Sequence, residues 1–247
     1  MIRRSWSLGA LALLSVACSS PEPELVVNVF AASSLTDVFA DVEEAFEEQY
    51  LEFDVQLNVA GSSALREQIR SGAPADVFAF ASQDIALELE DEGLILVEDI
   101  FATNALTVAL APGNPASISS LSDLERDELL IGVCAAGLPC GDLASQTLEA
   151  AGVAANVDTE EPDVRSLLSK VDAGELDAGI VYQTDVLASD AALEVIDFGL
   201  SEPLVTSYPI GVVEDATNSE GAATFVEFVL SDEGRNILAE AGFGLPE

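Results

Sequence analysis

Residues 25–46 read LVVNVFAASSLTDVFADVEEAF, and they set a strand, a tight loop and a helix in immediate succession. The apolar, valine-rich run at 26–30 is typical of a buried strand. After the small residues Ala31 to Ser34, apolar residues recur at the spacing of one helix face: Leu35, Val38, Phe39, Val42 and Phe46. Two serines therefore stand where a buried strand turns into a helix.

The junction at Ser33 and Ser34 is suited to an anion. The first N–H groups of a helix lack an acceptor within the helix, and the helix dipole is positive there. A serine at this position can also serve only as a helix cap. A second example favours the anion, because the alternating strand 53–59 ends in AGSSAL, which again places paired serines, Ser62 and Ser63, before a helical pattern. Loops at the carboxyl ends of neighbouring parallel strands face one site.

The order of strand and helix patterns predicts an α/β fold with two doubly wound lobes joined by a hinge. An apolar strand at 103–112 leads into the second lobe, whose strand at 178–182 ends in Tyr182. The predicted division is a signal peptide of lipoprotein type at 1–17, a tether at 18–24, lobe 1 at 25–103, lobe 2 at 104–213, and C-terminal helices at 214–247 that return to lobe 1.

The N-terminus has the pattern of an export signal. Arg3 and Arg4 precede an apolar run at 8–16, which is too short to span a membrane, and Ala17 and Cys18 follow. We expect lipidation at Cys18 and membrane attachment through that lipid; ordinary cleavage nearby is the alternative. The protein is then extracytoplasmic, either in the periplasm or on the outer face of the cell membrane.

In an oxidising compartment the remaining cysteines, Cys134 and Cys140, are expected to form a disulfide. Gly137 and Pro139 lie between them and suit a small closed loop. Two free buried thiols are the alternative. A zinc site is disfavoured, because two cysteines without any histidine cannot complete a common zinc shell.

The charge balance excludes whole classes of partner. The chain has 8 Lys+Arg against 45 Asp+Glu, and removing a signal that holds two arginines and no acid leaves 6 against 45, a net charge of −39. Such a protein does not bind nucleic acid by neutralising phosphates, nor adsorb to anionic lipid by its own surface. The acids favour solubility, and a high-salt habitat is a special case. Any bound anion must be held by short-range dipoles.

Catalysis is the weaker interpretation. The chain has no histidine, so serine has no ordinary general base, and a Ser–Lys pair would need Lys170, which the helical pattern places on a solvated face. There is no Walker loop and no G-x-G-x-x-G. Serine hydroxyls, free N–H groups and a tyrosine hydroxyl are donors, which suits a fully ionised oxyanion and disfavours hydrogen phosphate, whose P–OH needs an acceptor.

Several segments together resemble the periplasmic molybdate-binding protein of ABC transporters: FAASSLT at 30–36, GSSAL at 61–65, GAPADVF at 72–78, DVR at 163–165 and GIVY at 179–182. The resemblance spans the mature chain in order. It implies a type II periplasmic-binding architecture, no enzymatic activity, no cofactor, and a monomer that carries molybdate or tungstate to an ABC permease. Molybdenum is held only as the oxyanion, so no metal-cation site is implied.

The resemblance also implies a set of ligand-binding residues. Ser34 and Ser62 correspond to serines that bind through both hydroxyl and N–H, Cys140 and Val164 to backbone N–H donors, and Tyr182 to a hydroxyl donor. Cys140 departs from the alanine common at its position, which an N–H donor tolerates. The serine register leaves Ser33 and Ser63 as alternates. A binder of sulfate, a metal ion or an organic acid on the same fold, and an exported serine hydrolase with an unusual base, are the rival functions.

Overall fold

The computed structural model describes residues 25–246. The predicted signal peptide, the tether and the lipidation of Cys18 lie outside the described residues. Within 25–246 no helix combines the length and the apolar character needed to cross a membrane.

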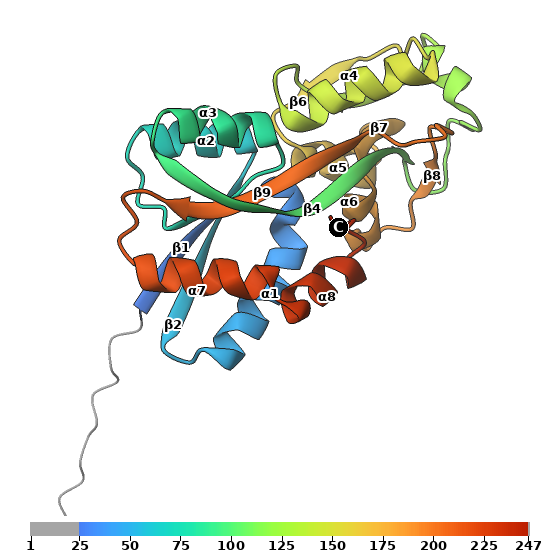
Figure 1. Ribbon diagram of the computed structural model, residues 1–247. Coiled ribbons are helices and arrows are strands. Elements are labelled where there is room, and N and C mark those ends of the chain that lie inside the picture. The colour runs from blue at the N-terminus through green and yellow to red at the C-terminus, as the bar shows by residue number, and fades with distance from the viewer. Residues whose placement is uncertain (1–24, 247) are drawn as a thin grey trace, which may run out of the picture.

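The first lobe is built on the parallel strands β1, β2 and β3, with β1 in the centre (Figure 1). Helices α2 and α3 cover one face of this sheet, and α1 and α7 cover the other. Its elements are β1 (Leu25–Ala32), η1 (Ser33–Leu35), α1 (Thr36–Gln49), β2 (Phe53–Ala60), α2 (Ser62–Arg70), β3 (Val77–Ala79), α3 (Gln83–Asp91), α7 (Ser219–Leu230) and α8 (Asp232–Glu240).

The second lobe is organised around β7, which pairs in parallel with β5 and antiparallel with β4. Helix α5 packs so closely on this sheet that a Cβ at Gly132 would lie 2.6 Å from Leu167 Cδ1. The elements are η2 (Leu121–Glu125), β5 (Ile131–Cys134), α4 (Pro139–Ala151), β6 (Thr159–Glu161), α5 (Val164–Asp172), β7 (Ala178–Tyr182), α6 (Gln183–Ala188) and β8 (Glu194–Ile196).

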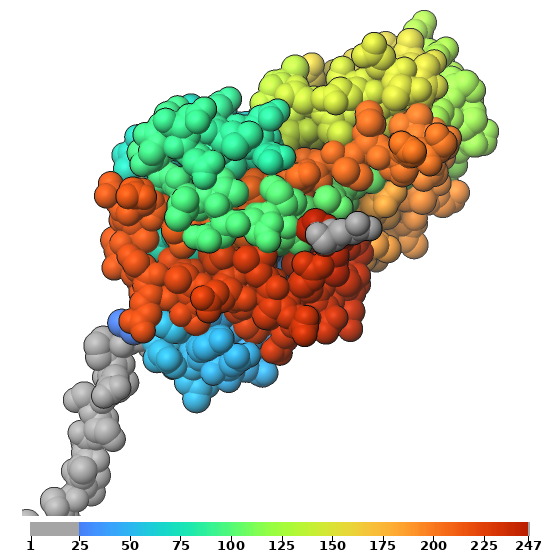
Figure 2. All heavy atoms as spheres, viewed as in Figure 1, coloured from blue at the N-terminus to red at the C-terminus, as the bar shows by residue number. Residues whose placement is uncertain are grey.

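Two long strands, β4 (Ile95–Leu110) and β9 (Val205–Val213), join the lobes. They pair with each other from Ile95 to Ala105, and β4 then pairs with β7 from Leu106 to Leu110. In Figures 1 and 2 both strands cross from one lobe to the other over the same face of the molecule. The connection between lobes is therefore two antiparallel strands, the geometry of a hinge.

The lobes have separate hydrophobic cores. In the first lobe, Phe225 of α7 packs against Phe39 and Phe46 of α1, with ring centroids 6.2 and 5.2 Å apart. The second core is mainly aliphatic and includes the fully buried Ile180 and Leu167. The prediction of an α/β fold with two lobes is confirmed.

Candidate functional site

A small cavity lies where the two lobes meet. The first lobe supplies the loops after β1, β2 and β3, and the second supplies the starts of α4 and α5 and the end of β7. Its volume of about 20 Å³ is little more than the space of one water. This compartment suits an ion of a few atoms. It is lined by Ala32, Ser33, Ser34, Gly61, Ser62, Ala81, Leu138, Pro139, Cys140, Pro162, Asp163, Val164 and Tyr182.

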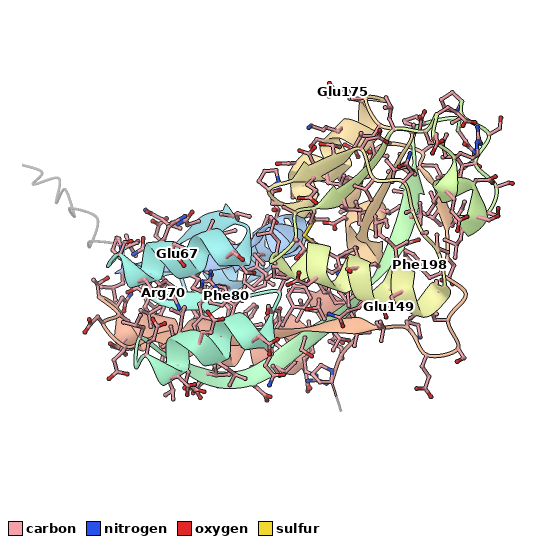
Figure 3. The ribbon with its side chains drawn as sticks, turned by 90° about the horizontal axis from the view of Figure 1, so that it is seen from above. Glu67, Arg70, Phe80, Glu149, Glu175 and Phe198 are labelled. Atoms are coloured by element: carbon pink, nitrogen blue, oxygen red, sulfur yellow. A yellow bond between two sulfur atoms is a disulfide. The ribbon has the colours of Figure 1, made fainter. Side chains whose placement is uncertain are left out.

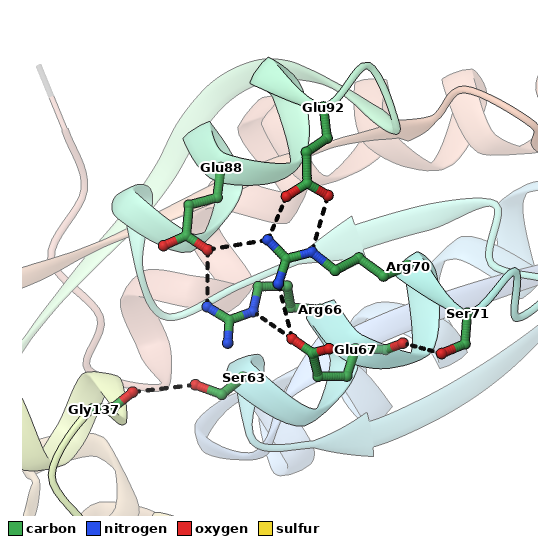
Figure 4. Close-up of polar contacts among 8 residues, drawn as sticks. All are labelled: Ser63, Arg66, Glu67, Arg70, Ser71, Glu88, Glu92 and Gly137. Carbon is green, nitrogen blue, oxygen red and sulfur yellow. Dashed lines mark hydrogen bonds and ion pairs between the residues drawn. The ribbon is translucent and has the colours of Figure 1, made fainter.

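The structure brings five residues singled out in the sequence to this cavity: Ser34, Ser62, Cys140, Val164 and Tyr182. Of the two alternates, Ser33 also lines it. Ser63 does not: its side chain is directed from α2 toward the other lobe, where its Oγ lies 3.4 Å from the carbonyl oxygen of Gly137 (Figure 4).

Three of the four helices that begin at the cavity leave their first N–H groups free of side-chain caps. No cap hydrogen bond is formed at η1, α2 or α4, whose N-cap residues are Ala32, Gly61 and Leu138. The interpretation of Ser33 or Ser34 as a helix cap is therefore wrong. Helix α4 starts at Pro139, a residue well suited to the first helical position. Cys140 thereby falls in the first turn, where its N–H has no acceptor within the helix.

Helix α5 is capped in a way that spares the cavity. The Asp163 carboxylate accepts from the N–H of Ser166 at 2.8 Å and from the Ser166 hydroxyl at 2.9 Å. Val164, at the first helical position, has no acceptor for its N–H within the helix. Asp163 lines the cavity, yet its carboxylate oxygens already have these donors.

Each of the two serine hydroxyls has a hydrogen-bond partner within the protein. The backbone N–H of Ala81 donates to Ser62 Oγ at 2.9 Å, and Ser34 Oγ lies 2.9 Å from the hydroxyl of Tyr208. Neither partner is a base, which counts against a serine nucleophile. Ser62 has used an acceptor position and still has its own hydrogen to donate.

Tyr182 ends β7 with its side chain 1 % exposed. Among the described residues its hydroxyl has no hydrogen-bond partner. Burial, followed by the neighbouring Tyr208, raises the pKa of this hydroxyl well above its ordinary value. The group is therefore a protonated donor that faces the cavity without an acceptor.

The basic side chains within residues 25–246 are all engaged elsewhere. Arg165, beside the cavity, donates to the Asp37 carboxylate at 2.7 Å and so links α5 to α1 across the two lobes. The others contact Glu67, Glu88 and Glu92 (Arg66 and Arg70, Figure 4; Arg70 and Glu67 are also labelled in Figure 3), Glu128 (Arg126), Glu161 (Lys170) and the carbonyl of Pro246 (Arg235).

The side chain of Lys170 is partly exposed and also forms an ion pair that the sequence pattern did not indicate. Its Nζ is 2.5 Å from Oε1 of Glu161, a buried carboxylate, and this contact lowers the pKa of Glu161. The Lys170 side chain remains 40 % exposed, so it lies on a solvent-accessible face as expected, and the sequence pattern missed only its ion pair with Glu161 of β6. Lys170 is thus committed to an ion pair and is not a base for a serine.

A buried carboxyl below the cavity need not repel an anion. Asp185 accepts from the N–H of Tyr182 at 3.1 Å, and its side chain is buried. Burial raises the pKa of Asp185 to about 8, which favours its uncharged form.

The predicted disulfide is confirmed. Cys134, at the end of β5, is bonded to Cys140 in the first turn of α4, with the Cα atoms 5.7 Å apart. The bond ties the Cys140 backbone to the sheet, so the position of its N–H does not depend on the loop 135–138 alone.

A wider groove of about 450 Å³ opens between α3 and α4. Asp84, Glu88 and Asp142 line it, together with Arg66, which is paired with Glu88. Its charge does not suit an anion. Residues 25–246 contain no cluster of three or more histidine, cysteine or acidic side chains arranged to hold a metal ion.

The comparisons with known proteins agree with this architecture. The sequence profile of a family described as bacterial extracellular solute-binding protein matches residues 27–244. The molybdate-binding protein ModA of Mycobacterium tuberculosis is 36% identical over 221 residues, which cover 89% of this chain and 85% of the relative.

Two solved structures share the fold at low sequence identity. The periplasmic molybdate-binding protein of Azotobacter vinelandii superposes with a TM-score of 0.77 at 18% identity, covering 90% of this chain and all (100%) of the neighbour. The sulfate-binding protein SubI of Mycobacterium tuberculosis superposes with a TM-score of 0.75 at 18% identity, covering 89% and 86%.

Proposed function

The chain belongs to the family of bacterial extracellular solute-binding proteins, and we propose that it binds molybdate, and also tungstate, in the cavity between its lobes and delivers it to an ABC import permease. The chain is thus a binding protein and not an enzyme. The proposal is carried by one observation: hydroxyls of Ser34, Ser62 and Tyr182 and the first-turn N–H groups of α4 and α5 converge on a single small cavity.

A cavity of donors selects an anion that carries no proton. Molybdate accepts at every oxygen, whereas hydrogen phosphate must also donate from its P–OH. The one carboxylate that lines the cavity, Asp163, is already bonded to Ser166. The P–OH of phosphate would therefore have to share a carboxylate whose two oxygens each already accept one bond, in a cavity otherwise lined by donors, which disfavours phosphate relative to a fully ionised anion.

The cavity also explains how neutral donors hold a dianion in so acidic a protein. Hydrogen bonds to a charged group contribute about 1.5–3 kcal/mol each, more than those between neutral groups. The low dielectric of a closed cleft strengthens them further. Several donors aimed at one ion offset the long-range repulsion of the surface acids.

Sulfate is the second candidate, because it is also fully ionised and a sulfate-binding protein shares the fold. Hydrogen-bond donors do not discriminate between sulfate and molybdate, because both ions only accept, so the size of the ion must provide the discrimination. The similarity to a molybdate-binding relative across 89% of the chain favours the larger ion.

Titration calorimetry of the chain from residue 25 onward, with molybdate, tungstate, sulfate and phosphate in parallel, tests the proposal. We expect one-to-one binding of molybdate and tungstate, weaker or absent heat with sulfate, and none with phosphate. A response to sulfate alone would reassign the ligand and keep the fold. Silence with all four ions would contradict anion binding altogether.

Binding is expected to be faster in salt. The chain carries a formal net charge of −37, so a dianion approaches against long-range repulsion, which salt screens as the Debye length falls from about 30 Å at 0.01 M to about 10 Å at 0.1 M. We expect the association rate constant to rise roughly two- to tenfold over this range. Stopped-flow tyrosine fluorescence measures it; equal effects of NaCl and KCl identify screening, and a rate that falls with salt contradicts the prediction.

The remaining parts of the proposal concern how the ion reaches the permease. The lobes close about β4 and β9, and the Arg165–Asp37 ion pair joins them in the closed form. The exported chain acts as a monomer and is held at the outer face of the membrane by a lipid on Cys18. Its lobes are divided at the boundaries 25–103, 104–213 and 214–247.

A further inference from the structure

A run of buried polar side chains lies behind Ser34, in the region where the lobes join. The Tyr208 hydroxyl on β9 is 2.9 Å from Ser34 Oγ and 3.5 Å from Nδ2 of Asn104 on β4. The same Nδ2 donates to the hydroxyl of Thr184 on α6 at 2.7 Å. Each of these side chains is more than nine-tenths buried. Polar groups are rarely kept at such depth without a role.

Asn104 determines which groups donate and which accept in this series of hydrogen bonds. Its Oδ1 accepts from the N–H of Ala105 at 3.0 Å, which fixes the amide so that its N–H₂ group faces Thr184 and Tyr208. An amide nitrogen can only donate. The Tyr208 oxygen therefore has a donor on one side, at long distance, and its own hydrogen is left for Ser34.

Ser62 shows what such an arrangement achieves. A backbone N–H also can only donate, so the bond from Ala81 settles that Ser62 Oγ accepts from behind. The hydroxyl hydrogen of Ser62 is then free for the cavity. If Ser34 instead donated to Tyr208, it would present only lone pairs to the cavity and would repel an anion.

We infer that Tyr208 is a positioning residue for the anion site: its hydroxyl donates to Ser34 Oγ and thereby turns the Ser34 hydrogen toward the bound oxyanion. This inference rests on the proposed function. Tyr208 does for Ser34 what the Ala81 N–H does for Ser62, so both serines are held as donors. Because Tyr208 is buried, its pKa is raised, and the hydroxyl keeps its proton throughout the working pH range.

A double-mutant cycle with Tyr208→Phe and Ser34→Ala, read by calorimetry with molybdate, tests the inference. Tyr208→Phe keeps the ring that packs on Phe101 and Phe243. We expect it to weaken binding by about three- to tenfold in the natural sequence, the effect of one neutral hydrogen bond. In the Ser34→Ala background, where there is no hydroxyl to orient, the same change should alter the affinity by less than about twofold.

Tyr50→Phe is the matched control. Tyr50 follows α1, and its ring packs on Phe46, 4.9 Å away, remote from the cavity. Its variant should bind as the natural protein does, and circular dichroism checks that each variant is folded.

The outcomes separate the inference from the proposed function. An equal loss in both backgrounds would mean that Tyr208 acts through packing, and an unchanged affinity would mean that Ser34 needs no partner; either result overturns the inference alone. Failure of the natural sequence to bind any of the four oxyanions overturns the proposed function and the inference together.

Discussion

Replacing Ser62 with alanine is expected to weaken molybdate binding by about 10- to 100-fold. The change removes one hydroxyl donor to a dianion, a bond of the charge-assisted class. It also leaves the buried N–H of Ala81, which donates to Ser62 Oγ at 2.9 Å, without an acceptor. This second effect should lower the free energy of unfolding of the ligand-free protein by about 1 kcal/mol or more. Calorimetry gives the affinity and a thermal melt gives the stability.

Ser63→Ala is the natural control, since it makes the same chemical change one residue further along. Ser63 is half-buried and does not line the cavity, and among the described residues its hydroxyl makes only the long contact to the carbonyl oxygen of Gly137, 3.4 Å (Figure 4). We expect less than a twofold change in affinity and no change in stability. A larger loss for Ser63→Ala than for Ser62→Ala would show that the serine register is shifted by one residue.

The part of the site that could be predicted from sequence is the part built from local signals. A strand, a loop of small residues and a helix follow each other at Ser34 and again at Ser62, and each signal lies within about a dozen residues. Parallel strands then bring the two loops to the same edge of the sheet. The two loops meet for reasons of chain topology, which the alternation of strands and helices reveals.

The capping rule failed because the helices begin before the serines that were expected to cap them. Serine before a helix commonly accepts from an N–H of the first turn. Here the N-cap residues are Ala32 and Gly61, and Ser34 and Ser62 instead bond to Tyr208 and Ala81, residues distant in sequence. A rule based on neighbouring residues cannot predict contacts with residues distant in sequence. It therefore named the right residues and gave the wrong reason for them.

The hinge was only half predicted. The strand expected at 103–112 in fact begins at Ile95. Its first part was missed because Glu98 and Asp99 interrupt the apolar pattern, at the point where the register of β4 against β9 shifts. The same pairing brings Asn104 and Tyr208 together behind Ser34. In the sequence, Asn104 and Tyr208 stand out only as polar side chains within segments whose other residues are typical of buried strands. Nothing in the spacing of residues could tell which partner each would meet.

Tyr182→Phe is expected to change stability and affinity in opposite directions. The Tyr182 hydroxyl is buried without a hydrogen-bond partner among the described residues. An unsatisfied buried polar group costs about 1–3 kcal/mol. Removing the hydroxyl while keeping the ring should therefore raise the melting temperature of the ligand-free protein by at least about 2–4 °C. The same change removes a donor to the dianion and should weaken molybdate binding by about 10- to 100-fold.

Thermal melts with and without molybdate measure both effects in one experiment. A ligand that binds only the folded state stabilises it by RT ln(1 + [L]/Kd), so the variant should melt above the natural protein when ligand is absent and gain less when ligand is added. Tyr208→Phe is the control, because its hydroxyl is hydrogen-bonded to Ser34 and its loss should lower the melting temperature of the free protein.

The opposite signs for two buried tyrosines distinguish a hydroxyl that contacts the ligand from one that acts through a neighbouring side chain. The Tyr208 hydroxyl is satisfied within the fold by its bond to Ser34, so its loss lowers the stability of the free protein. A hydroxyl kept unsatisfied at a cost to stability is best explained by a partner that arrives from solution. If Tyr182→Phe lowers the melting temperature of the free protein and leaves the affinity unchanged, Tyr182 is a core residue and the anion is held by the serines and the helix starts alone.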